Sequence, residues 1–269
     1  MTAVTATRTA RHVSAVAAVR HGATLAWRSL VKIKSSPEQL IDVTLQPIIF
    51  LLLFVYVFGG AIAGGGDTTK YLQFLLPGLL VQTALFSTMG TGYALNSDIS
   101  KGVFDRFRSL PISRIAPLAG AVVGDIARYT VSIVVLVAAG MVMGFRIHTD
   151  PLSVLAACLL VLAFSLALGW VSIFIGMLAP SPQSVQGFGM IFMFPLTFGS
   201  SIFAPAGSMP GWLQAWVKIN PVTKLADATR GLMTGGAVLD PVLYSLGWAV
   251  VIVAIFAPLA MRLYRRKTS

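Results

Sequence analysis

Long apolar segments, separated by shorter polar stretches, dominate the hydrophobic pattern of this chain. They cover residues 41–57, 74–95, 118–145, 152–179, 185–204 and 242–261. A helix needs roughly 20 residues to cross about 30 Å of hydrocarbon, and these segments are near or above that length. The pattern therefore predicts an all-α integral membrane protein with six transmembrane helices and both termini on the same side of the bilayer.

Capping residues mark the start of the first transmembrane helix. Ser36 has the residue type of an N-cap, and Pro37 suits the first helical position. Glu38 and Asp42 follow, four residues apart on one face, where negative charge favours a helix N-terminus. We expect this helix to end at the glycine pair 59–60 and the loop 64–67 that follows it.

A basic segment, residues 1–35, precedes the transmembrane domain of residues 36–269. Between residues 13 and 34, apolar side chains recur at helical spacing and basic side chains project from the opposite side. This pattern is typical of an amphipathic helix that lies in the membrane interface. An ordinary cytoplasmic helix beside the membrane is the alternative.

Two connections are too structured for simple turns. In the loop 96–117, Val103, Phe107 and Leu110 share one helical face, which predicts a short cytoplasmic helix between spans 2 and 3. The external stretch 205–241 contains two tryptophans at helical spacing, followed by a second short helical pattern before span 6. It is either a re-entrant segment or an extracellular cap.

Composition and charge agree with a membrane protein. Hydrophobic residues make up 56% of the chain and charged residues 11%, which excludes an ordinary soluble enzyme and a disordered chain. Fourteen Lys and Arg lie on the side that holds both termini and five on the other, so both termini are predicted to be cytoplasmic. The net charge of +11 follows this topology, and we expect no nucleic-acid binding.

Residue patterns for catalysis are missing. The sequence has no phosphate-binding Gly-rich motif, its three histidines are dispersed, and Cys158 is its single cysteine, so catalysis and metal binding are not expected. Asp125 and Arg128, three residues apart within span 3, either neutralise each other or act in transport.

Aromatic and sulfur-containing residues of span 5 are the candidates for an apolar transport path. They are Phe188, Met190, Phe192 and Phe198. Lipid-facing packing is the alternative explanation for these residues.

Specific residue runs resemble a known family. The six spans, the loop from Asp98 to Pro111, the Asn220-Pro221 pair and the Arg230-Gly231-Leu232 run are similar to ABC type-2 transporter permeases. More narrowly, residues 32–34, 37–45, 50–54 and 58–61 resemble the daunorubicin-resistance permeases of actinobacteria.

The resemblance implies a transport subunit, not an enzyme, in the cell membrane of a bacterium. A separate ATP-binding subunit would bind ATP and Mg²⁺, and a second permease, identical or a sister chain, would complete a path for hydrophobic drugs or natural products. Alternating access would move them outward. The same architecture exporting a lipid, glycolipid or polysaccharide is one alternative, and a membrane anchor or sensor subunit is another.

The loop between spans 2 and 3 would be the coupling helix that docks on the ATP-binding subunit. Its residues are Asp98, Gly102, Val103, Phe104, Asp105, Arg106, Phe107, Arg108, Leu110 and Pro111.

The charge distribution makes a direct prediction about topology. A reporter that is active only in an oxidising compartment should stay inactive when fused to the C-terminus, because that end is predicted to be cytoplasmic. The same reporter inserted near residue 207, in the predicted external stretch, is the positive control. Activity of the C-terminal fusion would overturn the orientation.

Overall fold

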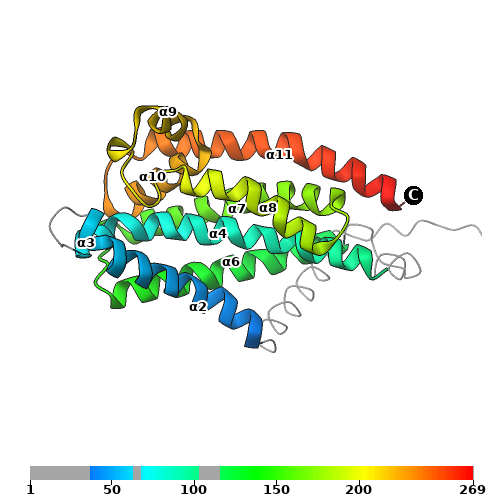
Figure 1. The fold of residues 1–269 in the computed structure, drawn as a ribbon, viewed down its shortest axis with the longest axis horizontal. Helices are drawn as coiled ribbons and strands as arrows, with labels where there is room; N and C mark the ends of the chain where they lie inside the picture. The colour runs from blue at the N-terminus through cyan, green and yellow to red at the C-terminus, as the bar shows by residue number, and fades with distance from the viewer. Residues whose placement is uncertain (1–36, 63–67, 103–115, 269) are drawn as a thin grey trace, which may run out of the picture.

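The computed structural model describes residues 37–62, 68–102 and 116–268, with side chains at 45–60, 68–102 and 124–263. Every regular element in these ranges is helical, so the all-α class is confirmed for the described part of the chain. Six helices form an elongated bundle (Figure 1). They are α2 (Pro37–Leu53), α4 (Thr68–Ser100), α6 (Ala116–Val142), α7 (Pro151–Leu178), α8 (Pro182–Phe198) and α11 (Leu239–Thr268).

Successive long helices run in opposite directions between the two ends of the bundle (Figure 1). We call the end where α4 finishes and α11 terminates the loop end. The opposite end, which we call the cap end, carries the short helices α9 (Gly211–Ile219) and α10 (Pro221–Thr234). The two short helices predicted in the stretch 205–241 are thus present as α9 and α10.

Four helices have the length and hydropathy of a membrane crossing. They are Thr68–Ser100, Gly124–Val142, Pro151–Leu178 and Leu239–Leu263. Two further helices are apolar but shorter: α8 has 17 residues, and the apolar part of the first helix covers Leu45–Phe58. The four long helices correspond to predicted spans 2, 3, 4 and 6.

The first helix does not end at its glycine pair. After Leu53 it continues as the π-helix η1 (Phe54–Phe58) and then as α3 (Gly59–Ile62). Gly59 is buried, and a Cβ there would lie 3.4 Å from the side chains of Thr68 and Tyr71. The glycine therefore allows close packing against the start of α4, where the sequence suggested a helix end.

The helix of span 5 is shorter than predicted. It stops at Phe198, and residues 199–204 are irregular although they contain no proline and no charged residue. Ser200, Ser201 and Ile202 are nevertheless buried. Irregular backbone at membrane depth is tolerated where protein groups satisfy its hydrogen bonds.

α4 forms the centre of the bundle, and most of its membrane-crossing part is buried. Its closest approach is to α7, where Gly92 faces Gly176 and the Ser172 carbonyl. A Cβ at Gly176 would lie 2.5 Å from the Gly92 carbonyl oxygen, so neither position has room for a side chain. One turn away, the Ser172 hydroxyl donates to Thr88 at 3.4 Å.

α7 begins at an exposed capping residue outside its membrane-crossing part. Asp150 accepts hydrogen bonds from the Ser153 hydroxyl at 2.7 Å and from the Ser153 amide at 3.1 Å. These bonds favour the ionised carboxylate and lower the pKa of Asp150. The N-terminus of α7 is thus satisfied by its own cap.

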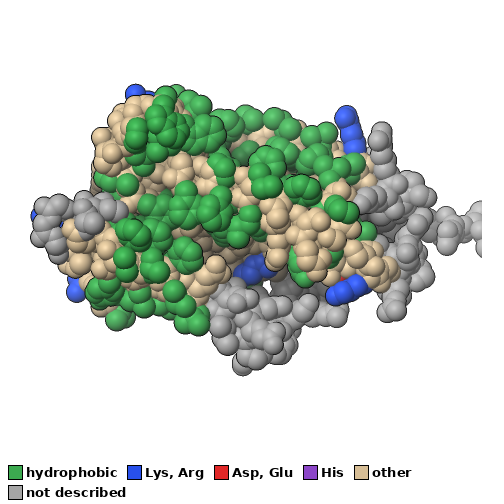
Figure 2. All heavy atoms as spheres, viewed as in Figure 1, with side chains coloured by type: hydrophobic (Ala, Val, Ile, Leu, Met, Phe, Trp, Pro, Cys, Tyr) green, Lys and Arg blue, Asp and Glu red, His purple; other side chains and the backbone are tan. Residues whose placement is uncertain are grey.

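The surface follows the distribution expected in a bilayer. Hydrophobic side chains cover much of the face between the two ends, and Lys and Arg are seen near the ends and at one recessed place between them (Figure 2). Basic residues near both ends and an apolar surface between them are typical of a membrane protein.

The α4–α7 contact predicts an asymmetric response to small substitutions on α7. Gly176→Ala should lower the thermal unfolding midpoint of the purified protein, because overpacking costs about 1–3 kcal/mol. Gly169→Ala, on the same helix with open space around it, should leave the midpoint unchanged or slightly higher. Equal midpoints for both variants would contradict the close contact.

Candidate functional site

The coupling residues of the loop between spans 2 and 3 are only partly within the described ranges. Asp98 lies in the last turn of α4, which continues to Ser100. Gly102 then has a φ of 65°, and its amide donates to the Ile99 carbonyl at 3.1 Å. This left-handed residue ends α4 and redirects the chain. Outside the described residues lie Val103, Phe104, Asp105, Arg106, Phe107, Arg108, Leu110 and Pro111.

The two acidic residues at the entry of the first span lie at the start of α2. The backbone of Glu38 and Asp42 belongs to the first turns of this helix, as predicted. Their side chains fall outside the described ones. The interfacial helix predicted within residues 13–34 also lies outside the described ranges.

The four path candidates are all exposed on α8 but lie on two sides of it: Phe188 and Phe192 on one, Met190 and Phe198 on another. Phe188, Met190, Phe192 and Phe198 expose between 42% and 58% of their surface. Large apolar side chains that are exposed on one helix do not fill the core of this chain. They contact lipid or a partner molecule instead.

The side of α8 that carries Met190 and Phe198 continues into a row of phenylalanine rings. Phe194 stacks on Phe198 at 4.8 Å between ring centroids, and Phe198 stacks on Phe203 at 5.0 Å. Phe203 stacks in turn on Phe54 at 4.5 Å, and Phe54 stacks on Phe58 at 5.2 Å. We call these five rings the aromatic row.

The aromatic row joins two elements that are distant in sequence, η1 and α8 with the segment that follows it. Phe54 and Phe58 were not among the path candidates. They belong to the π-helix, which places residues 54 and 58 on the same side. π-helical turns are frequent at functional sites, but the sequence of this segment gives no clear sign of one.

The charged pair of span 3 is self-neutralised. Arg128 contacts the Asp125 carboxylate at 2.5 Å and donates to the Ser87 carbonyl at 3.0 Å. The Thr91 hydroxyl donates to the other oxygen of Asp125. This arrangement confirms neutralisation, one of the two interpretations of the i,i+3 spacing, and it joins α6 to α4.

A second charged cluster fixes α10 against the irregular segment after α8. The Arg230 guanidinium donates to the Phe74 carbonyl at 3.0 Å, to the Ser201 carbonyl at 3.1 Å and to Asp227 at 2.8 Å. It also lies over the Phe74 ring, 3.9 Å from the centroid. Burial lowers the pKa of Arg230, and the Asp227 carboxylate opposes this shift.

Further side chains satisfy the rest of the irregular segment. Asn220 donates to the Leu196 and Gly199 carbonyls, both at 2.8 Å, and the Tyr71 hydroxyl donates to the Phe203 carbonyl at 3.0 Å. These bonds hold Phe203 in the aromatic row. Asn220 and Arg230 were known only as parts of the family-like runs, and the structure assigns them this supporting role.

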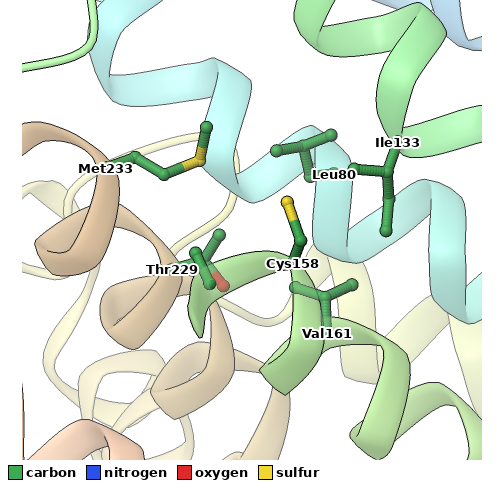
Figure 3. A pocket seen from close by; sticks show the side chains of 7 residues that line it. Leu80, Ile133, Cys158, Val161, Thr229 and Met233 are labelled. Atoms are coloured by element: carbon green, nitrogen blue, oxygen red, sulfur yellow. The ribbon is translucent and has the colours of Figure 1, made fainter. Parts of the chain in front are cut away.

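Cys158 lies beside a narrow apolar void in the core. Its sulfur points toward Leu80, and Val161, Met233 and Thr229 also line the void (Figure 3). The Thr229 hydroxyl is occupied by a bond to the Leu225 carbonyl at 2.7 Å. The void has no room for a water molecule, so Cys158 is a packing residue at this place.

The fold and the apolar surface define a multi-helix membrane protein. Comparison with protein-family models matches residues 21–234 to the ABC-2 type transporter family. The chain therefore belongs to this family, as its residue runs suggested, and it is a permease subunit of an ABC transporter. In this family ATP binding belongs to a partner chain.

Two relatives are similar to this chain over most of its length. The chain is 46% identical over 243 residues to the daunorubicin resistance ABC transporter permease protein DrrB1 of Streptomyces coeruleorubidus, which covers 90% of this chain and 85% of the relative. It is 28% identical over 225 residues to the doxorubicin resistance ABC transporter permease protein DrrB of Mycobacterium tuberculosis, covering 78% of this chain and 77% of the relative.

The Arg230 cluster predicts that lysine cannot replace this arginine. Arg230→Lys should lower the thermal unfolding midpoint, because a lysine lacks the planar fork that serves three acceptors and leaves buried carbonyls unpaired, at about 1–3 kcal/mol. Arg146→Lys, at an exposed site, is the control and should change little. A tolerated Arg230→Lys would mean that the cluster does not hold α10.

Proposed function

We propose that this chain is the six-span permease subunit of an ATP-driven exporter of hydrophobic aromatic drugs or natural products. The observation that carries the proposal is the 46% identity to a permease named for daunorubicin resistance, which extends over nearly the whole of both chains. The exposed phenylalanine side chains of α8 support the same substrate class, because planar rings stack on phenylalanine.

Six crossings are supported by how the two shorter helices are extended. α2, η1 and α3 form 26 continuous helical residues, about 39 Å long. α8 is about 26 Å long, and the buried segment 199–204 extends it toward the cap end. An even number of crossings puts both termini on one side, and the excess of basic residues makes that side cytoplasmic.

The transport path would run along the aromatic row and the side of α8 that carries Met190 and Phe198. Apart from the buried Phe203, these side chains are exposed or half-buried in one chain, so a second permease, identical or a sister chain, would enclose them. Of the four candidates, Met190 and Phe198 would then face the shared path, while Phe188 and Phe192 lie on another side of α8. The stacked rings offer apolar, flat contacts that suit a polycyclic aromatic substrate.

The loop end would dock on the ATP-binding subunit. Residues 101–115 connect α4 to α6 there, and the resemblance gives the coupling role to the loop between spans 2 and 3. ATP and Mg²⁺ would bind only to the partner chain. Closure of two partner subunits would displace the loop, and the two permeases would alternate between inward-open and outward-open states. Glu38 and Asp42 would lie at the same side of the membrane, at the entry of the first span.

Transport by vesicles tests the proposal. The chain is co-purified with its ATP-binding subunit, reconstituted in liposomes, and assayed for ATP-dependent daunorubicin movement. Phe198→Ala should lower the rate of ATP-dependent daunorubicin transport by about 2- to 10-fold, because one aromatic contact is worth about 0.5–1.5 kcal/mol.

Leu159→Ala is the matched control, since Leu159 is a similarly exposed apolar residue on α7. It should transport like the unmodified chain. Equal losses in both variants would remove α8 from the path. ATP turnover that no aromatic drug stimulates, without drug movement, would argue for export of an envelope lipid or polymer instead.

A further inference from the structure

Two buried asparagines make the same contact at the ends of two consecutive helices. Asn96 Nδ2 donates to the carbonyls of Gly176 and Ala179, both at 2.8 Å, at the end of α7. Asn220 makes the corresponding pair of bonds at the end of α8. In both cases the carbonyls are three residues apart in a last helical turn, where no further helical N–H reaches them. One amide group with two hydrogens satisfies both.

Asn96 lies at the loop end of α4. It is one turn before Ser100, whose hydroxyl donates to the Asn96 carbonyl at 2.8 Å, and α4 ends shortly afterwards at Gly102. One turn in the other direction is Gly92, which touches α7. A Cβ at Gly92 would also lie 3.2 Å from Val185, in the first turn of α8. This part of α4 therefore contacts the end of α7 and the start of α8.

The turn between α7 and α8 is short and restrained. Two prolines, Pro180 and Pro182, fix backbone φ angles on either side of Ser181. The Ser181 hydroxyl accepts a bond from the Ser184 amide at 3.2 Å and caps α8. Because this turn is restrained, a displacement of the end of α7 should move the start of α8 by a similar amount.

We infer that Asn96 is a positioning residue that links the end of α4, residues 96–102, to α8. A displacement imposed on residues 96–102 by the ATP-binding subunit reaches α8 through the two Asn96 bonds and the α7–α8 turn. Asn220 holds the opposite end of α8 on α10 and does not transmit the displacement of residues 96–102. The inference rests on the proposed function, because it needs an ATP-binding partner at the loop end.

The two asparagines provide their own matched pair of variants. Asn96→Asp keeps the side-chain shape but removes both amide hydrogens, and Asn220→Asp does the same at the cap end. The two residues are 3% and 1% exposed, so a purely structural role predicts similar losses for both variants. Asn96→Gln retains two donors and serves as the rescue variant.

Movement of α8 can be measured without a drug. Cys158→Ala first removes the single cysteine. Ile191 on α8 and Val250 on α11, both 67% exposed, are then replaced by cysteine and spin-labelled. The complex with its ATP-binding subunit, in lipid nanodiscs, is compared without nucleotide and with ADP and vanadate. The label distance should change in the Asn220→Asp and Asn96→Gln chains but not in Asn96→Asp.

Coupling is measured on the same variants in liposomes as daunorubicin moved per ATP hydrolysed. Asn96→Asp should keep assembly and basal ATP turnover within about twofold and lose roughly fivefold or more of the drug moved per ATP, the usual scale of coupling between sites. Asn220→Asp should leave this ratio unchanged, even where its thermal midpoint falls.

The outcomes separate this inference from the proposed function. A nucleotide-dependent distance change that survives Asn96→Asp, or is lost equally in Asn220→Asp, overturns the role of Asn96. An unmodified chain whose labels do not respond to nucleotide overturns it as well. A chain whose labels respond as expected but which moves no daunorubicin retains the Asn96 link and loses the proposed substrate class.

Discussion

The end of a helix cannot be hydrated where it is buried in protein, and this constraint explains where the few polar side chains of the bundle are used. No water reaches such a final turn, so its carbonyls must be satisfied by protein groups. Asn220, Arg230 and Tyr71 provide these partners for the end of α8 and the segment after it. Without them α8 could not stop at Phe198, and Phe203 would not reach the rings of η1.

The long helices were predictable from hydropathy because the bilayer selects long apolar runs directly. α4, α6, α7 and α11 therefore appear where the sequence indicates them, although α4 extends one turn into the predicted loop. The end of α8 was not predictable, because residues 199–204 contain no proline and no charged residue. Their irregular backbone is stabilised by hydrogen bonds from Asn220 and Arg230, which lie more than 20 residues later in the sequence. The π-helix has the same difficulty, since the run from Phe54 to Phe58 also suits an ordinary helix.

The candidate site was predictable where the relevant contacts are local. The spacing of Asp125 and Arg128 is enough to suggest their ion pair, and the exposed residues of α8 follow from its sequence. The contact between Phe54 and Phe203 joins segments about 150 residues apart and has no local signal. Asn96 is a similar case. A side-chain amide in an apolar helix indicates that a hydrogen-bond partner is needed, but the sequence does not show which carbonyls will accept its hydrogen bonds.

The unequal lengths of α7 and α8 have a consequence for the membrane around the protein. α7 is about 42 Å long and is packed tightly on α4, whereas α8 is about 26 Å long and is anchored to its own chain at the cap end. Adjustment to thicker or thinner lipid therefore falls on the least buried span, α11. The aromatic row keeps its depth and spacing, so the same rings remain available in membranes of different acyl-chain composition.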